Sequence, residues 1–208
     1  MHRVPISMWG EQRRIYEDVS RDLVAHLGNS MITTPMRVTQ LGRLHQICGG
    51  YVPDDDGNTH EVGRAKMRRL LRLVDLSRKP VVVFCKYRTE ISEIEAELLA
   101  VGYEVRVIMG KTPKKQRPQI IADFQRGRVD VLIAQERTGG VGIDLFKSSV
   151  AIFYSLTYSR VDFEQALARL HRRGQEFAVD VYLLFIVGTV DEDVYEAILA
   201  KDRITRRV

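Results

Sequence analysis

The chain has 208 residues, of which 45% are hydrophobic and 28% charged, and its net charge of +5 corresponds to a pI near 9.3. These proportions are typical of a soluble globular protein, and the length suffices for one domain, with or without a helical appendage. The mild positive charge favours a nucleic-acid partner only weakly, because many enzymes are equally basic.

The chain carries no signal for a membrane or a metal. No apolar run approaches the ~18 residues of a membrane span, and the first residues do not form a signal peptide. The two cysteines, Cys48 and Cys85, form no C-x-x-C pair and lie in apolar stretches. This pattern predicts buried free thiols in a reducing compartment, cytoplasmic or nuclear, without a metal site or a membrane partner.

Residues 1–79 are predicted to be helical. A helix is expected from Trp9 to Leu27, with Ile15, Val19, Leu23 and Leu27 at steps of four, and Gly28-Asn29 is expected to end it. Two more helices are expected, over residues 36–47 and 64–76. We expect these helices to form an extension that packs on the rest of the chain.

The third of these helices has two contrasting sides. One side is apolar and is expected to face inward. The other side carries Arg64, Arg68, Arg69 and Arg72. The arginines fit either a solvated face or a stripe that contacts phosphates, and both interpretations remain open.

From residue 80 to residue 208 the pattern changes to alternating strands and helices. The strands are expected at Val81–Cys85, Glu104–Met109, Val129–Ala134, Val150–Tyr154 and Val179–Val187. The helices are expected at Thr89–Val101, Pro113–Arg126, Phe163–Arg173 and Asp191–Lys201, with a late start or a kink at Pro118. Such alternation predicts an α/β fold with a mostly parallel sheet flanked by helices.

The loops after the strands should gather at one edge of this sheet, where parallel α/β proteins bind their ligands. Several basic residues fall there: Lys86, Arg88, Lys111, Lys114, Lys115 and Arg137. As a group they are candidates for contacts with a nucleic-acid backbone, although each alone fits a solvated surface charge equally well.

Two further motifs lie near this edge. The segment Gln165–Gln175 places Arg169 and Arg172 three residues apart on an expected helix, so both guanidinium groups can reach one anion. A glycine-rich turn, Thr138–Asp144, follows a hydrophobic strand. No G-x-x-x-x-G-K-[ST] phosphate loop is present in the sequence.

Together these motifs resemble the second RecA-like lobe of superfamily 2 helicases, and in particular the Swi/Snf-type ATPases. The resemblance covers nearly the whole chain. Its motifs are Glu11–Tyr16, Leu44–Cys48, Val81–Cys85, Phe124-Gln125, Gly139–Asp144 and Gln165–Gln175. The last motif is the most specific, and the strand motif alone is weak because any α/β protein has one.

The resemblance implies a set of roles. Arg169 and Arg172 would be arginine fingers that act on ATP and Mg²⁺ held by a first, phosphate-loop lobe, and Gln165 would orient them. Gly140, Gly142 and Asp144 would lie on the nucleotide side, and the basic loops would contact the backbone of double-stranded DNA. Asp144 stands where Swi/Snf-type proteins usually carry asparagine, so it is a candidate to hold one of the two arginines or the ribose.

Other interpretations exist for the same residues. The two arginines fit a structural role in which they pair with Glu164, Asp162 or another carboxylate to fix their helix. The whole chain fits a non-catalytic nucleic-acid-binding RecA-like module, although such a module has no chemical need for the finger pair. A Rossmann-type enzyme is disfavoured because the glycines follow G-G-x-G rather than G-x-G-x-x-G. We expect no ATPase activity from this chain alone.

Overall fold

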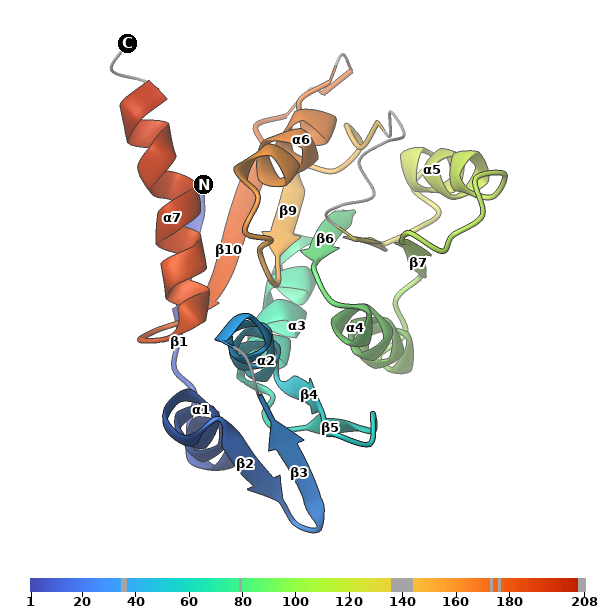
Figure 1. Ribbon diagram of the computed structural model, residues 1–208. Coiled ribbons are helices and arrows are strands. Elements are labelled where there is room, and N and C mark those ends of the chain that lie inside the picture. The colour runs from blue at the N-terminus through green and yellow to red at the C-terminus, as the bar shows by residue number, and fades with distance from the viewer. Residues whose placement is uncertain (35–36, 79, 136–143, 173, 176, 206–208) are drawn as a thin grey trace.

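The protein is built on one six-stranded sheet, in which every neighbouring pair of strands is parallel. Figure 1 shows a computed structural model, which describes residues 1–34, 37–78, 80–135, 144–172, 174–175 and 177–205. In spatial order the strands are β1 (His2–Ile6), β10 (Asp180–Ile186), β9 (Val150–Phe153), β6 (Val81–Cys85), β8 (Val131–Gln135) and β7 (Val105–Ile108).

Helices cover both faces of the sheet. One face packs on α3 (Ala65–Ser77) and α4 (Arg88–Ala100), and the other packs on α5 (Arg117–Gln125), α6 (Arg160–Leu170) and α7 (Val190–Thr205) (Figure 1). Side chains alternate between the two faces along each strand. In β6, for example, Val81 and Val83 belong to the hydrophobic cluster on the side of α3 and α4. Val82 and Phe84 belong to the cluster on the side of α5, α6 and α7. The expected α/β fold with a parallel sheet flanked by helices is confirmed.

The segment that precedes β6 is not purely helical. Its helices α1 (Gly10–Asp22), α2 (Arg37–Gly49) and α3 agree with the expected positions. It also holds two hairpins, β2 (Val24–Leu27) with β3 (Ser30–Thr33) and β4 (Tyr51–Pro53) with β5 (Thr59–Glu61), and it supplies β1 to the main sheet. The division at residue 80 stays a prediction, but the sheet crosses it.

The predicted end of the first helix is wrong. The helix stops at Asp22, where Leu23 has a left-handed φ of 61°, and the chain then forms β2 instead of another helical turn. Gly28 and Asn29 lie between β2 and β3, and Gly28 has a φ of 57°. A Gly-Asn pair between two strands is a hairpin turn, so the pair expected to stop a helix joins two strands instead.

The other boundaries follow ordinary capping rules. Pro118 lies in the first turn of α5, so the late start is confirmed. In α6 the Ser159 hydroxyl accepts a hydrogen bond from the Asp162 N–H and caps the helix at its start. The helix ends at Leu170, three residues earlier than expected.

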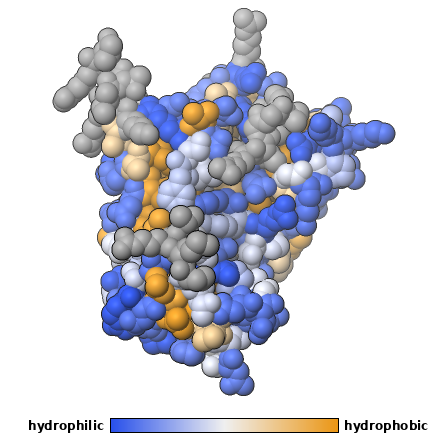
Figure 2. Space-filling model, viewed as in Figure 1, coloured by the Kyte–Doolittle hydropathy of each residue, from blue (hydrophilic) through white to orange (hydrophobic). Residues whose placement is uncertain are grey.

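The face of the molecule seen in Figure 2 is largely hydrophilic. Figure 2 shows narrow hydrophobic strips between broad hydrophilic areas on this face. Within the described ranges, no helix is both long enough and apolar enough to cross a membrane.

Candidate nucleotide and nucleic-acid interface

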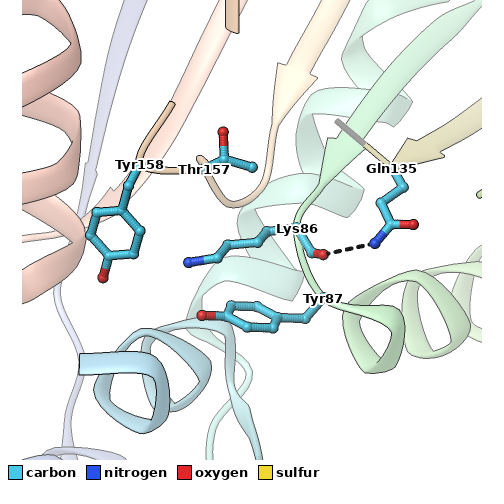
Figure 3. A pocket seen from close by; sticks show the side chains of 5 residues that line it. All are labelled: Lys86, Tyr87, Gln135, Thr157 and Tyr158. Carbon is cyan, nitrogen blue, oxygen red and sulfur yellow. Dashed lines mark hydrogen bonds between the residues drawn. The ribbon is translucent and has the colours of Figure 1, made fainter. Parts of the chain in front are cut away.

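The carboxyl edge of the sheet holds a cavity of about 250 Å³, lined by Lys86, Tyr87, Gln135, Thr157 and Tyr158 (Figure 3). Lys86 and Tyr87 follow β6, Gln135 is the last residue of β8, and Thr157 and Tyr158 follow β9, so the cavity lies where three strand ends meet. Gln135 ties the loops together, because its Nε2 donates to the Lys86 carbonyl at 3.3 Å and its Oε1 accepts from the Gly110 N–H at 3.2 Å.

The Lys86 side chain points between two aromatic rings rather than away from the protein. Its Nζ lies 4.2 Å from the ring centre of Tyr158 and 4.9 Å from that of Tyr87 (Figure 3). The same Nζ lies 3.0 Å from His45 Nδ1. Because an ammonium group can only donate, His45 Nδ1 accepts, and the proton of a neutral imidazole must be on Nε2. The predicted DNA-contacting lysine therefore has its charge engaged inside the site.

A chain of buried charges extends from Lys86 into the core. His45 Nε2 lies 3.2 Å from Asp191 Oδ1, close enough for an electrostatic contact between the ring and the carboxylate. The other Asp191 oxygen lies 2.6 Å from Lys66 Nζ and accepts from the Ile186 N–H at 2.7 Å. Lys66 and Asp191 are only 1% and 3% exposed, respectively.

The environment sets the charges of these groups. Burial lowers the pKa of His45 below its ordinary value of 6.5, which keeps the imidazole neutral at neutral pH. Burial alone would raise the pKa of Asp191, but the Lys66 ammonium and His45 hold the pKa of this carboxyl below its ordinary value. From the cavity inward, the series of groups is thus a cation (Lys86), a neutral ring (His45), an anion (Asp191) and a second cation (Lys66).

Glu90 supports the loop that carries Lys86. Its carboxylate is buried, accepts from the Ser155 hydroxyl and accepts from the Tyr87 N–H at 3.2 Å, while Ser155 Oγ also accepts from the Lys86 N–H at 2.8 Å. Burial raises the pKa of the Glu90 carboxyl. This cluster fixes the backbone between β6 and α4, at the floor of the cavity.

Sequence reasoning misses this network. It does not identify Lys66, His45 and Glu90 as site residues, and it places Asp191 only near the start of the last helix. No local pattern could have paired them, because the contacts join residues far apart in the chain. The single available signal is the position of Lys66 directly beside the inward-facing Met67 of α3.

The two motif arginines differ in environment. Arg169 is only 3% exposed, and both of its terminal guanidinium nitrogens lack a hydrogen-bond partner within the described residues. Burial, with a contribution from the nearby charge of Arg172, lowers its pKa. Buried donors without a hydrogen-bond partner are energetically costly, so this guanidinium is a candidate to bind an anion.

Arg172 is half exposed and lies beyond the end of α6. The expectation that both arginines share one helical face is therefore wrong, because the helix ends at Leu170 and His171 leaves helical geometry with a ψ of 58°. The Nε of Arg172 lies 3.4 Å from Asp144 Oδ1. Asp144 is expected from the sequence to hold Arg169 or Arg172, or the ribose; it lies beside Arg172, and its role toward a nucleotide stays a prediction.

The remaining predicted residues lie as follows. Gln165 is exposed on α6, and four of the basic residues are exposed near the carboxyl edge: Arg88, Lys111, Lys114 and Lys115. Gly140, Gly142 and Arg137 lie outside the described residues.

Arg117 is structural. Its guanidinium is buried and donates to the carbonyls of Met109, Gly110 and Thr112, so it closes the loop after β7.

Comparisons with known proteins agree with this geometry. The family model described as the helicase conserved C-terminal domain matches residues 65–174, which is more than half of the chain. The putative ATP-dependent helicase/translocase YwqA of Bacillus subtilis is 27% identical over 201 residues, which cover 92% of this chain and 22% of that protein. The chromatin-remodeling ATPase INO80 of Aspergillus oryzae is 32% identical over 145 residues, 69% of this chain and 10% of that protein.

A similar fold is found in a solved structure, the Sulfolobus solfataricus SWI2/SNF2 ATPase core in complex with dsDNA. It aligns with a TM-score of 0.72 at 23% identity, over 94% of this chain and 42% of that chain. The chain spans about a fifth or less of the length of the curated relatives named above. It belongs to the family of helicase conserved C-terminal domains and has a RecA-like fold.

Proposed function

We propose that this chain is the C-terminal motor lobe of an ATP-dependent translocase that moves on double-stranded DNA. The observation that carries the proposal is the buried guanidinium of Arg169, which lies near the half-exposed Arg172. Both of its terminal nitrogens lack a hydrogen-bond partner among the described residues. Two relatives, a helicase/translocase and a chromatin-remodeling ATPase, support the same activity by their names. The SWI2/SNF2 core of similar fold, which was solved in complex with dsDNA, supports the choice of nucleic acid.

The two arginines fit the oxygens of a nucleotide phosphate. They supply several N–H donors and two positive charges, which is what the redistributing charge of phosphoryl transfer requires. Magnesium prefers carboxylate and water oxygens, whereas the two arginines present only N–H donors. A first lobe with a phosphate loop would therefore hold ATP and Mg²⁺, and the bound ion would neutralise the phosphate oxygens.

Within this scheme Asp144 positions the finger before nucleotide binds. Its ion pair with Arg172 is half exposed on both sides and therefore weak, on the order of 0–1 kcal/mol. A phosphate group with more negative charge can compete for the guanidinium at little cost. Arg169, which is buried beneath, would stabilise the same charge from the core side.

The basic loops would contact the DNA backbone. Arg88, Lys111, Lys114 and Lys115 are exposed near the carboxyl edge, which suits contacts that follow phosphates without reading sequence. Lys86 is better explained as a positioning residue, because its ammonium group is already engaged by His45 and two tyrosine rings.

The central test uses a motor that contains both lobes. Arg172→Ala should lower the rate of ATP hydrolysis by about 10³–10⁵-fold and leave nucleotide affinity nearly unchanged, since a finger acts mainly on the transition state. Arg172→Lys should fail as well, because an ammonium group lacks the planar fork. Arg128→Ala, which removes a surface arginine paired with Asp123, is the matched control.

The alternative is a non-catalytic nucleic-acid-binding lobe. Near-normal hydrolysis by the Arg172→Ala motor, with a normal thermal melt, would establish that the arginine is structural and favour this alternative. The isolated chain is a second check, because it lacks a phosphate-loop motif and should release no phosphate above background with duplex DNA and Mg²⁺.

A further inference from the structure

Trp9, the only tryptophan of the chain, is among the exposed large hydrophobic residues. Its side chain is 77% exposed and follows the end of β1, directly before α1. Two hollows of about 420 Å³ and 490 Å³ share Trp9 in their linings. The indole therefore stands between two open spaces, where a planar group can lie against it.

Three arginines of α3 line the smaller hollow: Arg68, Arg69 and Arg72. All three are exposed, and none has a carboxylate within ion-pair distance in the part of the chain that the structure describes. The arginines nearby behave differently, since Arg13 pairs with Glu17 and Arg64 pairs with Glu97. The trio thus forms a patch of positive charge that the protein leaves without a partner of its own.

This patch is separate from the proposed duplex contact. It lies at β1, one edge strand of the sheet, whereas Lys111, Lys114 and Lys115 follow β7, the strand at the opposite edge. A polyanion that binds at Trp9 would therefore be additional to the duplex at the loop that follows β7.

We propose that the hollow between Trp9 and α3 binds a single-stranded nucleic acid, with one unpaired base stacked on the indole and the neighbouring phosphates on Arg68, Arg69 and Arg72. Aromatic platforms beside a basic groove are how proteins bind single strands without reading sequence. A duplex offers the platform only its two terminal base pairs, because stacking covers all of its other base faces. Arg68 and Arg72 are four residues apart on α3, so they lie on one side of it and can contact successive phosphates.

An acidic peptide fits the site less well. An extended peptide would add to the free edge of β1, but Pro5 in that strand has no N–H to donate. The indole would also contribute little to a chain of carboxylates. The combination of a flat apolar ring with unpaired arginines matches a nucleotide, which offers a planar base and a charged phosphate together.

The test uses the fluorescence of Trp9 in the purified chain, since no other tryptophan contributes signal. Titration with an oligothymidylate should quench the emission, whereas a duplex of equal length and polyglutamate should not. Trp9→Ala should weaken single-strand binding about ten-fold or more, measured with a labelled oligonucleotide, and Trp9→Phe should retain most of the affinity.

The charge contribution is tested by salt dependence. Each phosphate contact to a single strand contributes about 0.7 to the slope of log affinity against log salt, so Arg68→Ala/Arg72→Ala should lower the slope by about 1.4. The same double variant should keep duplex binding. Lys111→Ala/Lys115→Ala should do the reverse, with weaker duplex binding and unchanged quenching, and a thermal melt of each variant checks the fold.

Three outcomes would overturn the proposal. The first is unchanged emission at saturating oligothymidylate. The second is equal quenching by polyglutamate, which would identify an acidic-peptide site. The third is loss of Trp9 exposure to acrylamide when the chain is joined to its phosphate-loop lobe, which would make the patch a contact between lobes. A failed hydrolysis test of Arg172 would leave this binding test unaffected.

Discussion

Replacing Lys66 by methionine should destabilise the protein strongly. The Nζ of Lys66 lies 2.6 Å from Asp191 Oδ2 and donates to the Tyr154 carbonyl at 2.9 Å, and both charged side chains are almost fully buried. Methionine fills a similar volume but carries no charge. The change therefore leaves the Asp191 carboxylate buried with only the Ile186 N–H and the 3.2 Å contact to His45.

The magnitude follows from that imbalance. Removing one partner of a buried ion pair costs about 3–5 kcal/mol, because the remaining charge is desolvated and unpaired. For a chain of this size each kcal/mol lowers the melting temperature by about 2–4 °C, so the expected drop is about 6–20 °C. The double variant Lys66→Met/Asp191→Asn removes both charges together and should regain much of the loss.

Urea and thermal unfolding followed by circular dichroism would measure these changes. Lys111→Met is the matched control, because Lys111 is exposed, and a surface change of this kind usually stays within about 0.5 kcal/mol. A loss below about 1 kcal/mol for Lys66→Met, or a double variant no more stable than the single one, would refute the claim that a buried ion pair is at stake.

Further predictions concern a glycine, a histidine and an arginine. Gly50→Ala should cost about 2 kcal/mol or more, because Gly50 has a φ of 96° and an added Cβ would strike the Gly63 carbonyl oxygen. Gly42→Ala, where an added Cβ meets nothing within 4 Å, should instead gain about 0.5–1 kcal/mol, and denaturant midpoints compare the two. Burial lowers the pKa of His45, so the unfolded chain binds more protons than the folded chain as the pH falls through 6.5. The contribution of the neutral imidazole to the free energy of unfolding is therefore present above pH 6.5 and is lost below it. The melting temperature should therefore fall less for His45→Asn than for the parent chain between about pH 7.5 and about pH 5.5, and equal falls would argue against a buried neutral imidazole. Arg117→Met should destabilise the loop after β7 by removing donors from three carbonyls, which faster hydrogen exchange at Thr112 would report and unchanged exchange would contradict.

Elements with strong local signals could be predicted from the sequence. The apolar runs at β6, β8 and β9 are buried throughout or nearly so, and Pro118 marks the start of α5. By contrast, β1 has five residues, a proline and only one buried side chain, so nothing in its own sequence distinguishes it from a loop. Its strand geometry comes from pairing with β10.

The site divides in the same way. The motif arginines can be found because their spacing is local, but the helix expected to carry both ends before Arg172. Asp144 can be foreseen as a partner of one of the two arginines, since all three residues belong to recognisable motifs, but only the structure selects Arg172. The buried network of His45, Lys66 and Asp191 cannot be foreseen. The sequence around a single charged residue does not indicate the distant partner that allows its burial.

The pairing of β1 with β10 has a consequence for synthesis. His2 lies opposite Tyr182 and Ile6 opposite Ile186, so β1 leaves the ribosome long before the strand with which it pairs. Closing a loop of that length costs on the order of 4–5 kcal/mol of chain entropy, before the contacts that repay it can form. We expect the strands β6 to β9 to assemble first, while residues 2–6 remain available to other chains as an unpaired strand. The nascent protein should thus be most prone to aggregation just before residue 186 emerges, and least so once β10 is in place between β1 and β9.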